Sequence, residues 1–318
     1  MRELYPPCEP TSTWMLETDS PHRAYVEECG NRDGIPVVFL HGGPGSGFKP
    51  YHRQFFNPRR YRVVIFDQRG CARSTPQGET RDNTTQLLLQ DMEAIRERLS
   101  IDRWVLFGGS WGAALALLYA RRYPQRVRAM ILRGTFLARQ KDVDWFFQRG
   151  VNAIFPDYWT EMLAAFKESE HSDLIEAAYQ RMQSGDSGER AAVARAWTGW
   201  TGRVVTYLLP EGPTTDVTDE DRQRMLNEVT VETHYARHHY FLEENQILRD
   251  VSMLPDVPTT IIHGRRDLTC TLESSWTLHQ ALPKSKFVIL RESGHLANDP
   301  AMIDALVTAS DELAEKME

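Results

Sequence analysis

The residue best placed for chemistry is Ser110, which lies in the sequence GGSWG at residues 108–112. This sequence fits G-x-S-x-G, a motif in which a sharp turn between a strand and a helix lifts the serine Oγ above the edge of a sheet. Glycines flank such a serine because a Cβ would collide with the neighbouring chain. The first amides of the following helix would stabilise an oxyanion beside the serine. The motif predicts a nucleophile, although a glycine-rich turn with an ordinary serine would give the same pattern.

Two later residues complete the set that a serine nucleophile needs. Asp267 and His295 each follow an apolar stretch that predicts a strand, so both are expected at the same sheet edge as Ser110. The histidine would take the serine proton and pass it to the leaving amine, and the aspartate would orient the imidazole and stabilise its cation. Taken singly, the aspartate could cap a helix and the histidine could lie in a turn. The order Ser, Asp, His matches that of α/β hydrolases, which favours a catalytic triad.

A second glycine-rich loop, HGGPGSG at residues 41–47, directly follows the apolar run at 36–40. Glycines let main-chain amides approach a ligand closely. The loop matches the His-Gly-Gly type that supplies an oxyanion-hole amide in α/β hydrolases. A phosphate-binding loop would end in Gly-Lys-Ser/Thr, which is missing, and a plain flexible turn stays open as an alternative.

Apolar runs and helical periodicity predict the elements that must position these groups. Strands are expected at residues 13–16, 22–29, 36–40, 61–66, 104–107, 127–132, 257–263 and 287–290, and helices at 85–99, at 113–120 and from about 301 to the end. Residues 137–250 show a helical pattern without strands. We therefore predict an α/β fold, with a mostly parallel central sheet flanked by helices and an inserted all-helical cap. The catalytic domain would comprise 1–136 and 251–318, and the cap 137–250.

Composition narrows the class of protein. The net charge is −7 and basic residues are not clustered, so a nucleic-acid partner is not expected. The four cysteines are scattered, which predicts neither a disulfide framework nor a thiolate metal site. The first residues lack the apolar core of a signal peptide, and no apolar run approaches the roughly 18 residues that a membrane span needs. We expect a cytoplasmic protein that does not bind membranes, and the sequence leaves its oligomeric state open.

Three motifs together resemble the proline iminopeptidase family, which is also called prolyl aminopeptidase and consists of serine peptidases with an α/β-hydrolase fold. They are HGGPG at 41–45, DQRGCARS at 67–74 and GGSWG at 108–112, and the likeness spans nearly the whole chain. The resemblance implies release of N-terminal proline from peptides or aminoacyl amides through an acyl-enzyme, without a cofactor. It also implies an oxyanion hole from the amides of Gly43 and Trp111. Phe136 would line the pyrrolidine pocket, with Arg133 and Cys270 near it.

The family holds the substrate ammonium with two cap glutamates, and this chain keeps only one of them. The Glu-x-His-Tyr segment is present with Glu232, but the Trp-x-x-Trp-Glu-Gly segment reads WTGWTG at 197–202, which places Thr201 where the family has glutamate. A threonine offers a neutral hydroxyl in place of a charge-assisted bond worth about 1.5–3 kcal/mol. We therefore expect Glu232 alone to carry the ammonium charge. A broader aminoacyl arylamidase or esterase stays open as an alternative, as does a non-catalytic ligand-binding protein.

One rival site is a pair of histidines, His234 and His238, at a helical i, i+4 spacing that can bind zinc. The glutamate of an H-E-x-x-H motif does not follow the first histidine, and the sequence offers no evident third ligand. We expect these histidines to serve cap packing and the polarity of the pocket, and we expect no metal.

Overall fold

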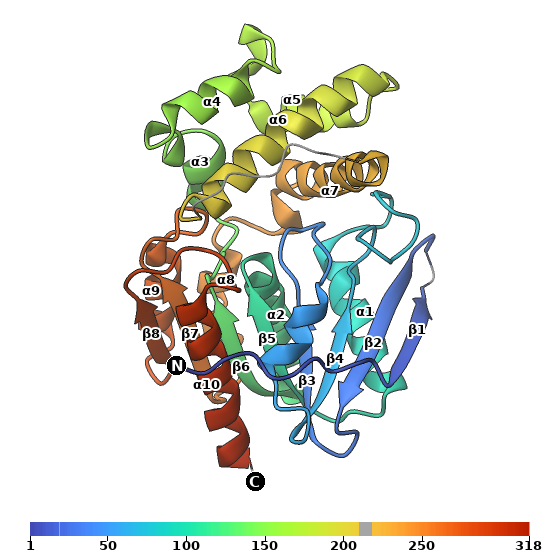
Figure 1. Ribbon diagram of the computed structural model, residues 1–318, viewed down its shortest axis with the longest axis vertical. Helices are drawn as coiled ribbons and strands as arrows, with labels where there is room; N and C mark the ends of the chain where they lie inside the picture. The colour runs from blue at the N-terminus through green and yellow to red at the C-terminus, as the bar shows by residue number, and fades with distance from the viewer. Residues whose placement is uncertain (19, 210–217, 318) are drawn as a thin grey trace.

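The structure is a computed structural model and describes residues 1–18, 20–209 and 218–317. Within these residues the strands are β1 (Ser12–Glu17), β2 (Arg23–Gly30), β3 (Ile35–Leu40), β4 (Tyr61–Phe66), β5 (Trp104–Gly109), β6 (Val127–Arg133), β7 (Thr259–Gly264) and β8 (Lys286–Leu290). They form one sheet in the order β1-β2-β4-β3-β5-β6-β7-β8 (Figure 1). The pairs β1–β2 and β2–β4 are antiparallel, and all later neighbours are parallel. The carboxyl ends of the parallel strands therefore share one edge of the sheet.

Helices cover both faces of this sheet (Figure 1). They are α1 (Thr85–Arg98), α2 (Trp111–Arg122), α9 (Leu272–Ala281), α10 (Pro300–Met317) and the 3-10 helix η1 (Pro50–Phe55). Side chains of β5 alternate between two apolar layers, as the period of two in a strand requires. Trp104 and Leu106 join the layer beneath α1 and α2, whereas Val105 and Phe107 join the layer that contains η1 and α10. The apolar run of β5 thus reflects burial on both faces.

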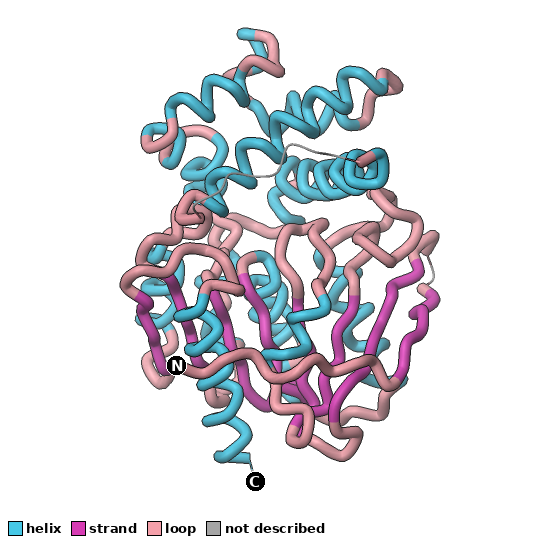
Figure 2. Tube along the Cα trace, viewed as in Figure 1, coloured by secondary structure: helices cyan, strands magenta, loops and turns pink. Residues whose placement is uncertain are grey.

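A layer of helices lies across the edge where the parallel strands end. The chain between β6 and β7 forms α3 (Gln140–Phe147), α4 (Pro156–Leu163), α5 (Leu174–Met182), α6 (Ser187–Thr206), α7 (Asp219–Arg237) and α8 (Gln246–Arg249). Short 3-10 turns also occur, at η2 (Pro124–Arg126), η3 (Val151–Ala153), η4 (Glu168–Glu170), η5 (His239–Phe241) and η6 (Val251–Met253). Figure 2 shows α3 to α7 as a layer above the loops that leave the strands. We call α3 to α7 the helical layer. This architecture confirms the predicted fold class.

Each predicted strand is present, with ends that differ by at most two residues, and both ends of the strand at 61–66 agree. Helix α2 begins at Trp111, two residues before the predicted start, because the turn at Ser110 leads directly into it. Helix α10 begins at Pro300, and Glu318, which the prediction included, lies outside the described residues. Helix α9 and the turn η1 were not predicted, since both are short and weakly periodic.

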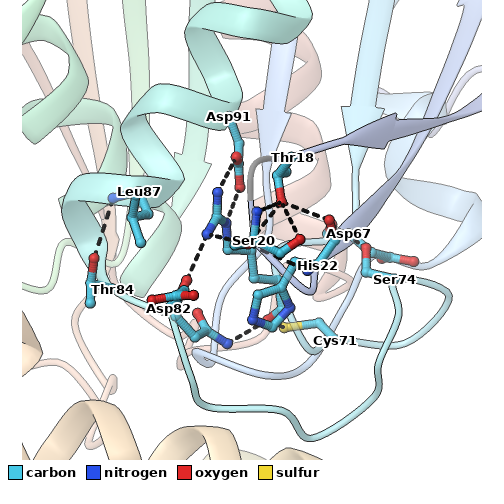
Figure 3. A network of polar contacts seen from close by, with 12 residues as sticks. Thr18, Ser20, His22, Asp67, Cys71, Ser74, Asp82, Thr84, Leu87 and Asp91 are labelled. Atoms are coloured by element: carbon cyan, nitrogen blue, oxygen red, sulfur yellow. Dashed lines mark hydrogen bonds and ion pairs between the residues drawn. The ribbon is translucent and has the colours of Figure 1, made fainter.

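The loop that follows β4 is held from beneath by a buried polar network (Figure 3). Arg69 donates to both carboxylate oxygens of Asp91 in α1, at 2.6 and 2.7 Å, and both side chains are buried. The same guanidinium donates to the Asp82 carbonyl oxygen at 2.6 Å and to the Ser20 hydroxyl at 3.1 Å. One arginine therefore ties this loop to α1 and to the turn between β1 and β2.

Candidate active site

Ser110 lies in a strained turn between β5 and α2, with φ of 57° and ψ of −124°. A residue with a side chain adopts a positive φ only at a cost. The two motif glycines make the turn possible. A Cβ on Gly108 would lie 2.2 Å from the carbonyl oxygen of Gly112, and a Cβ on Gly112 would lie 2.0 Å from that of Leu40. Both distances are far below any allowed contact, so the turn holds Ser110 at the sheet edge only with glycine at these positions.

His295 and Asp267 meet beside this turn. Nδ1 of His295 lies 2.7 Å from Oδ2 of Asp267, and their loops follow β8 and β7. The buried Asp267 carboxylate also accepts hydrogen bonds from the amides of Thr269 and Cys270, each at 2.9 Å. Burial opposes ionisation of Asp267, but the charge and hydrogen bond of His295 outweigh it and hold the pKa below its usual value. The aspartate is thus ionised and orients the imidazole.

The serine and histidine side chains face the same cavity without a hydrogen bond between them. Oγ of Ser110 instead lies 3.8 Å from Sγ of Cys270. A hydrogen bond between a catalytic serine and its histidine is often long or poorly aligned before substrate binds. Burial raises the pKa of the Cys270 thiol well above its usual value, so this neighbour is a neutral thiol and no competing nucleophile. Arg133 donates to the main-chain carbonyl of His295 and thereby fixes the histidine loop.

The two amides expected to form an oxyanion hole belong to Gly43 and Trp111. Among the described residues neither amide has a hydrogen-bond acceptor. Gln68 connects the loop of Gly43 to Trp111. Its main-chain N–H donates to His41 Nε2 at 3.0 Å, and its side-chain oxygen accepts from Trp111 Nε1 at 2.9 Å. Burial lowers the pKa of His41, which keeps the imidazole neutral and able to accept. Sequence reasoning assigned no such role to Gln68, because the contact joins three separate loops.

A cavity of about 390 Å³ opens above the serine, between the sheet edge and the helical layer. Eight of the ten predicted site residues line it, namely Gly43, Ser110, Arg133, Phe136, Thr201, Glu232, Cys270 and His295. The other two adjoin it: Asp267 through its bond to the histidine, and Trp111 as the residue after the serine.

Aromatic rings form the apolar wall of the cavity. Phe136 meets Tyr240 edge to face at a centroid distance of 4.9 Å, and Phe147 stacks on Trp197 at 4.3 Å. Tyr240 comes from η5, far along the chain from the sheet loops, and sequence reasoning did not identify it. A saturated ring of a few carbons would bury its surface well against such a wall.

The end of the cavity formed by α7 is acidic. Glu232 accepts a hydrogen bond from Trp197 Nε1 at 2.7 Å. Burial, opposed in part by this bond, and the charge of Glu228 raise the pKa of Glu232 to about 8. Thr201 also lines the cavity, and its hydroxyl donates to the Thr198 carbonyl at 3.4 Å. Sequence reasoning missed Glu228, although its i, i+4 spacing from Glu232 on a helix was a usable signal.

The histidine pair considered as a zinc site bonds to main-chain carbonyls. Nε2 of His234 lies 2.9 Å from the Asn83 oxygen, and Nδ1 of His238 lies 2.8 Å from the His234 oxygen. The centroids of the two rings are 4.7 Å apart, and both rings pack against Phe241, with only His238 stacked on it. In the part of the chain that the structure describes, no group of three or more His, Cys, Asp or Glu side chains could hold a metal ion. No described helix combines the length and the apolar character that a membrane crossing requires.

Comparison with known proteins places this geometry in context. Residues 35–301 match the family model for the alpha/beta hydrolase fold. The chain is 44% identical over 315 residues to a proline iminopeptidase of Xanthomonas citri, covering 99% of this chain and 100% of that one. It is 40% identical over 312 residues to a probable proline iminopeptidase of Leptolyngbya boryana, covering 98% and 97%. Among solved structures, a hydrolase from Pseudomonas aeruginosa PA01 shares the fold at a TM-score of 0.65, with 17% identity over 94% of this chain and 98% of that one.

Proposed function

Because this chain belongs to the proline iminopeptidase family of α/β hydrolases, we propose that it is a serine exopeptidase that releases N-terminal proline from peptides. One observation carries the proposal from the molecule itself. Ser110, His295, Glu232 and several aromatic rings all line one cavity. A free N-terminal ammonium bound at the acidic end would bring the first peptide bond of the substrate to the serine.

In the proposed reaction Ser110 Oγ attacks the carbonyl carbon of the N-terminal proline while His295 takes its proton. The amides of Gly43 and Trp111 stabilise the oxyanion of the tetrahedral intermediate. Collapse breaks the C–N bond, and His295 protonates the leaving amine of the shortened peptide. Water then attacks the prolyl ester of Ser110 by the same route, which releases proline and restores the serine. Asp267 orients the imidazole and stabilises its positive charge throughout.

Substrate selection in this proposal depends on the cavity wall and its acidic end. The pyrrolidine ring lies against Phe136 and Tyr240, and the ammonium faces Glu232. An acylated or internal proline has no charge to offer there and leaves a buried carboxylate unpaired, which is costly. Arg133 and Cys270 complete the pocket beside the serine. The domains proposed for these two tasks are the catalytic residues 1–136 and 251–318 and the cap residues 137–250.

A panel of substrates tests the proposal by kcat/KM. It compares prolyl, alanyl and leucyl 2-naphthylamides with acetyl-prolyl 2-naphthylamide and p-nitrophenyl acetate. We expect the prolyl amide to be preferred at least tenfold over the alanyl and leucyl amides, roughly the contribution of one well-filled apolar pocket. We expect the acetylated amide not to be cleaved, because it has no ammonium to pair with Glu232. Equal rates on the prolyl, alanyl and leucyl amides would contradict a prolyl aminopeptidase.

The second candidate function is a broader aminoacyl arylamidase or esterase on the same scaffold. It is favoured by Thr201, which lines the cavity without a charge. Fast turnover of the uncharged ester together with weak discrimination among the amides would support it.

We also propose small peptides or aminoacyl amides as the substrates. We propose the cytoplasm as the compartment, because the four cysteines are all free thiols.

A further inference from the structure

The acidic end of the cavity contains a second glutamate, Glu228, one helical turn before Glu232. Both project from the same face of α7, because residues four apart in a helix are neighbours, and both line the cavity above the serine. Helix α7 rests directly on the loop after β3 at this point. A Cβ on Gly45 would lie 3.0 Å from the Glu228 carbonyl oxygen, so the glycine allows close contact. The position of Glu228 is thereby set by the same loop that contributes Gly43.

Neither glutamate is neutralised by a basic side chain in the described chain. Glu232 accepts only the indole N–H of Trp197, and the Glu228 carboxylate has neither a hydrogen bond nor an ion pair. Arg224, the basic residue one turn earlier on α7, is engaged by Asp221 at 2.5 Å. Two carboxylates thus face one cavity without a basic partner among the described residues.

A third acidic residue that lines the same cavity, Asp142, is paired with a basic side chain of the protein. Asp142 of α3 lines the cavity, but Arg139 holds it in an ion pair at 2.7 Å, and the Ser274 hydroxyl donates to it at 3.2 Å. Its charge is therefore satisfied within the protein. The contrast with Glu228 shows that this cavity does not lack basic partners in general, but lacks them at α7.

The pKa values of both glutamates are raised, which indicates the kind of ligand that would suit this end of the cavity. Burial raises the pKa of Glu228 despite the opposing charges of Lys49 and Arg224, and burial together with the Glu228 charge raises the pKa of Glu232. Both shifts mean that this part of the cavity favours the protonated carboxyl groups more than water does. A ligand that brings its own positive charge would stabilise both, and unpaired charges of this kind concentrate at functional sites.

We propose that Glu228 is a second substrate-binding carboxylate, which together with Glu232 accepts the two N–H donors of the secondary ammonium of an N-terminal proline. The identity of this ammonium rests on the proposed function. The secondary ammonium of proline has two N–H bonds, so two acceptors satisfy it completely. Glu228 takes the place of the carboxylate that is absent at Thr201, and both charges then come from α7. This revises the sequence-based expectation that Glu232 acts alone.

The test measures binding without turnover. In a Ser110→Ala background, calorimetry gives the dissociation constant of prolyl 2-naphthylamide and of its uncharged counterpart, acetyl-prolyl 2-naphthylamide, near neutral pH. We expect Glu228→Gln to weaken the charged ligand by roughly 10- to 100-fold and to change the uncharged one by less than about twofold. Glu220→Gln is the matched control, since it removes the same charge from the exposed start of α7 and should change neither constant.

Three outcomes would overturn the proposal. One is a charged-ligand constant that stays within twofold in Glu228→Gln. Another is an equal loss for both ligands, which would make Glu228 a residue that shapes the cavity. The third is a larger loss in Thr201→Val than in Glu228→Gln, which would move the contact to the threonine.

Glu228→Asp keeps the charge and should retain more affinity than Glu228→Gln. Thermal unfolding identifies any variant that fails to fold. If Glu228→Gln does not fold, equal affinity of Glu228→Asp and the parent for the charged ligand, despite the shortened side chain, would count against the contact.

Failure of the proposed function would look different. Charge-selective binding that depends on Glu228, in a wild-type chain that does not cleave prolyl 2-naphthylamide, would support the ammonium site and contradict the peptidase. Proline release with no dependence of binding on Glu228 would support the peptidase and contradict this inference.

Discussion

Acidic residues with little exposure to water are treated differently around the sheet and on α7, the helix of the helical layer that faces the serine. Around the sheet the protein supplies their partners: Asp91 is held by Arg69 at 2.6 Å, and Glu27 by Arg53 at 2.8 Å. On α7 the protein supplies no basic partner to Glu228 or Glu232 within the described ranges.

This difference separates two uses of a buried charge. A buried pair within the chain gives little net stability, but removal of one partner is costly because the other charge stays buried alone. Such pairs hold loops in place, as Arg69 holds the loop after β4. An unpaired carboxylate lowers stability until a cation arrives, so it is retained where a ligand supplies that cation. In the proposed reaction, the sheet region would position the reacting groups and the helical layer would select the substrate.

The largest effect is expected at the serine, whose replacement leaves the charges of both regions untouched. Ser110→Ala should lower kcat by several orders of magnitude, because the nucleophile is lost and only binding and the oxyanion hole remain. The fold should persist, since alanine keeps the Cβ of the turn. Steady-state kinetics with prolyl 2-naphthylamide and thermal unfolding measure both. Turnover near the wild-type rate would remove Ser110 from the mechanism.

The next effect concerns stability of the sheet region. Asp91→Asn should lower the free energy of unfolding by about 3–5 kcal/mol, because it leaves the Arg69 guanidinium buried without its counter-charge. Denaturant unfolding measures the loss. Glu17→Gln is the control: it breaks an exposed pair with Arg23 and should cost less than about 1 kcal/mol. Similar losses for the two variants would contradict the distinction between buried and exposed pairs.

Removal of the Glu232 carboxylate from the helical layer should lower activity without lowering stability. Glu232→Gln should reduce kcat/KM for prolyl 2-naphthylamide by an amount equivalent to about 2–5 kcal/mol, because the substrate ammonium is left desolvated and unpaired. The free energy of unfolding should not fall, since no ion pair between described residues is broken. A variant that lost stability as Asp91→Asn does, and lost activity only in proportion, would show that Glu232 holds the fold together.

The last effect is a pH dependence of stability that Glu232 should produce. The pKa of Glu232 is raised to about 8 in the folded protein, so the folded state binds its proton more tightly than the unfolded state does. Its contribution to stability is therefore complete below the ordinary glutamate pKa of about 4.3 and is lost as the pH rises toward 8. A rise in pH from about 4.3 to about 8 should therefore destabilise the Glu232→Gln variant less than the wild type. Parallel stability curves for the two proteins would contradict the raised pKa.

Local patterns in the sequence were enough to predict the sheet and the turn at the serine. The run before Ser110 is apolar at each position because β5 is buried on both faces, and the flanking glycines are required by backbone contacts within a few residues. Asp267 and His295 were also within reach, since each directly follows a strand of a parallel sheet. Their roles in catalysis stay predictions until the variants above are measured.

The residues that sequence reasoning missed contribute through contacts between distant segments. Tyr240 reaches the cavity from η5 and meets Phe136 there, and Gln68 joins the loop of His41 to Trp111. Helix propensity and periodicity describe neighbours along the chain, and they contain no information on which loop a side chain will meet across a cavity.

The amino-acid sequence by itself determined the strand order along the chain, the turn at Ser110 and the family, because each depends on local spacing and residue type. Only the tertiary structure decided which carboxylates share the cavity. Thr201 and Glu228 are separate in sequence and come from different helices, yet both line the same space above the serine. Whether a glutamate is paired or left for a ligand depends on which basic side chains fold against it, and that is settled by packing across helices α3, α6 and α7.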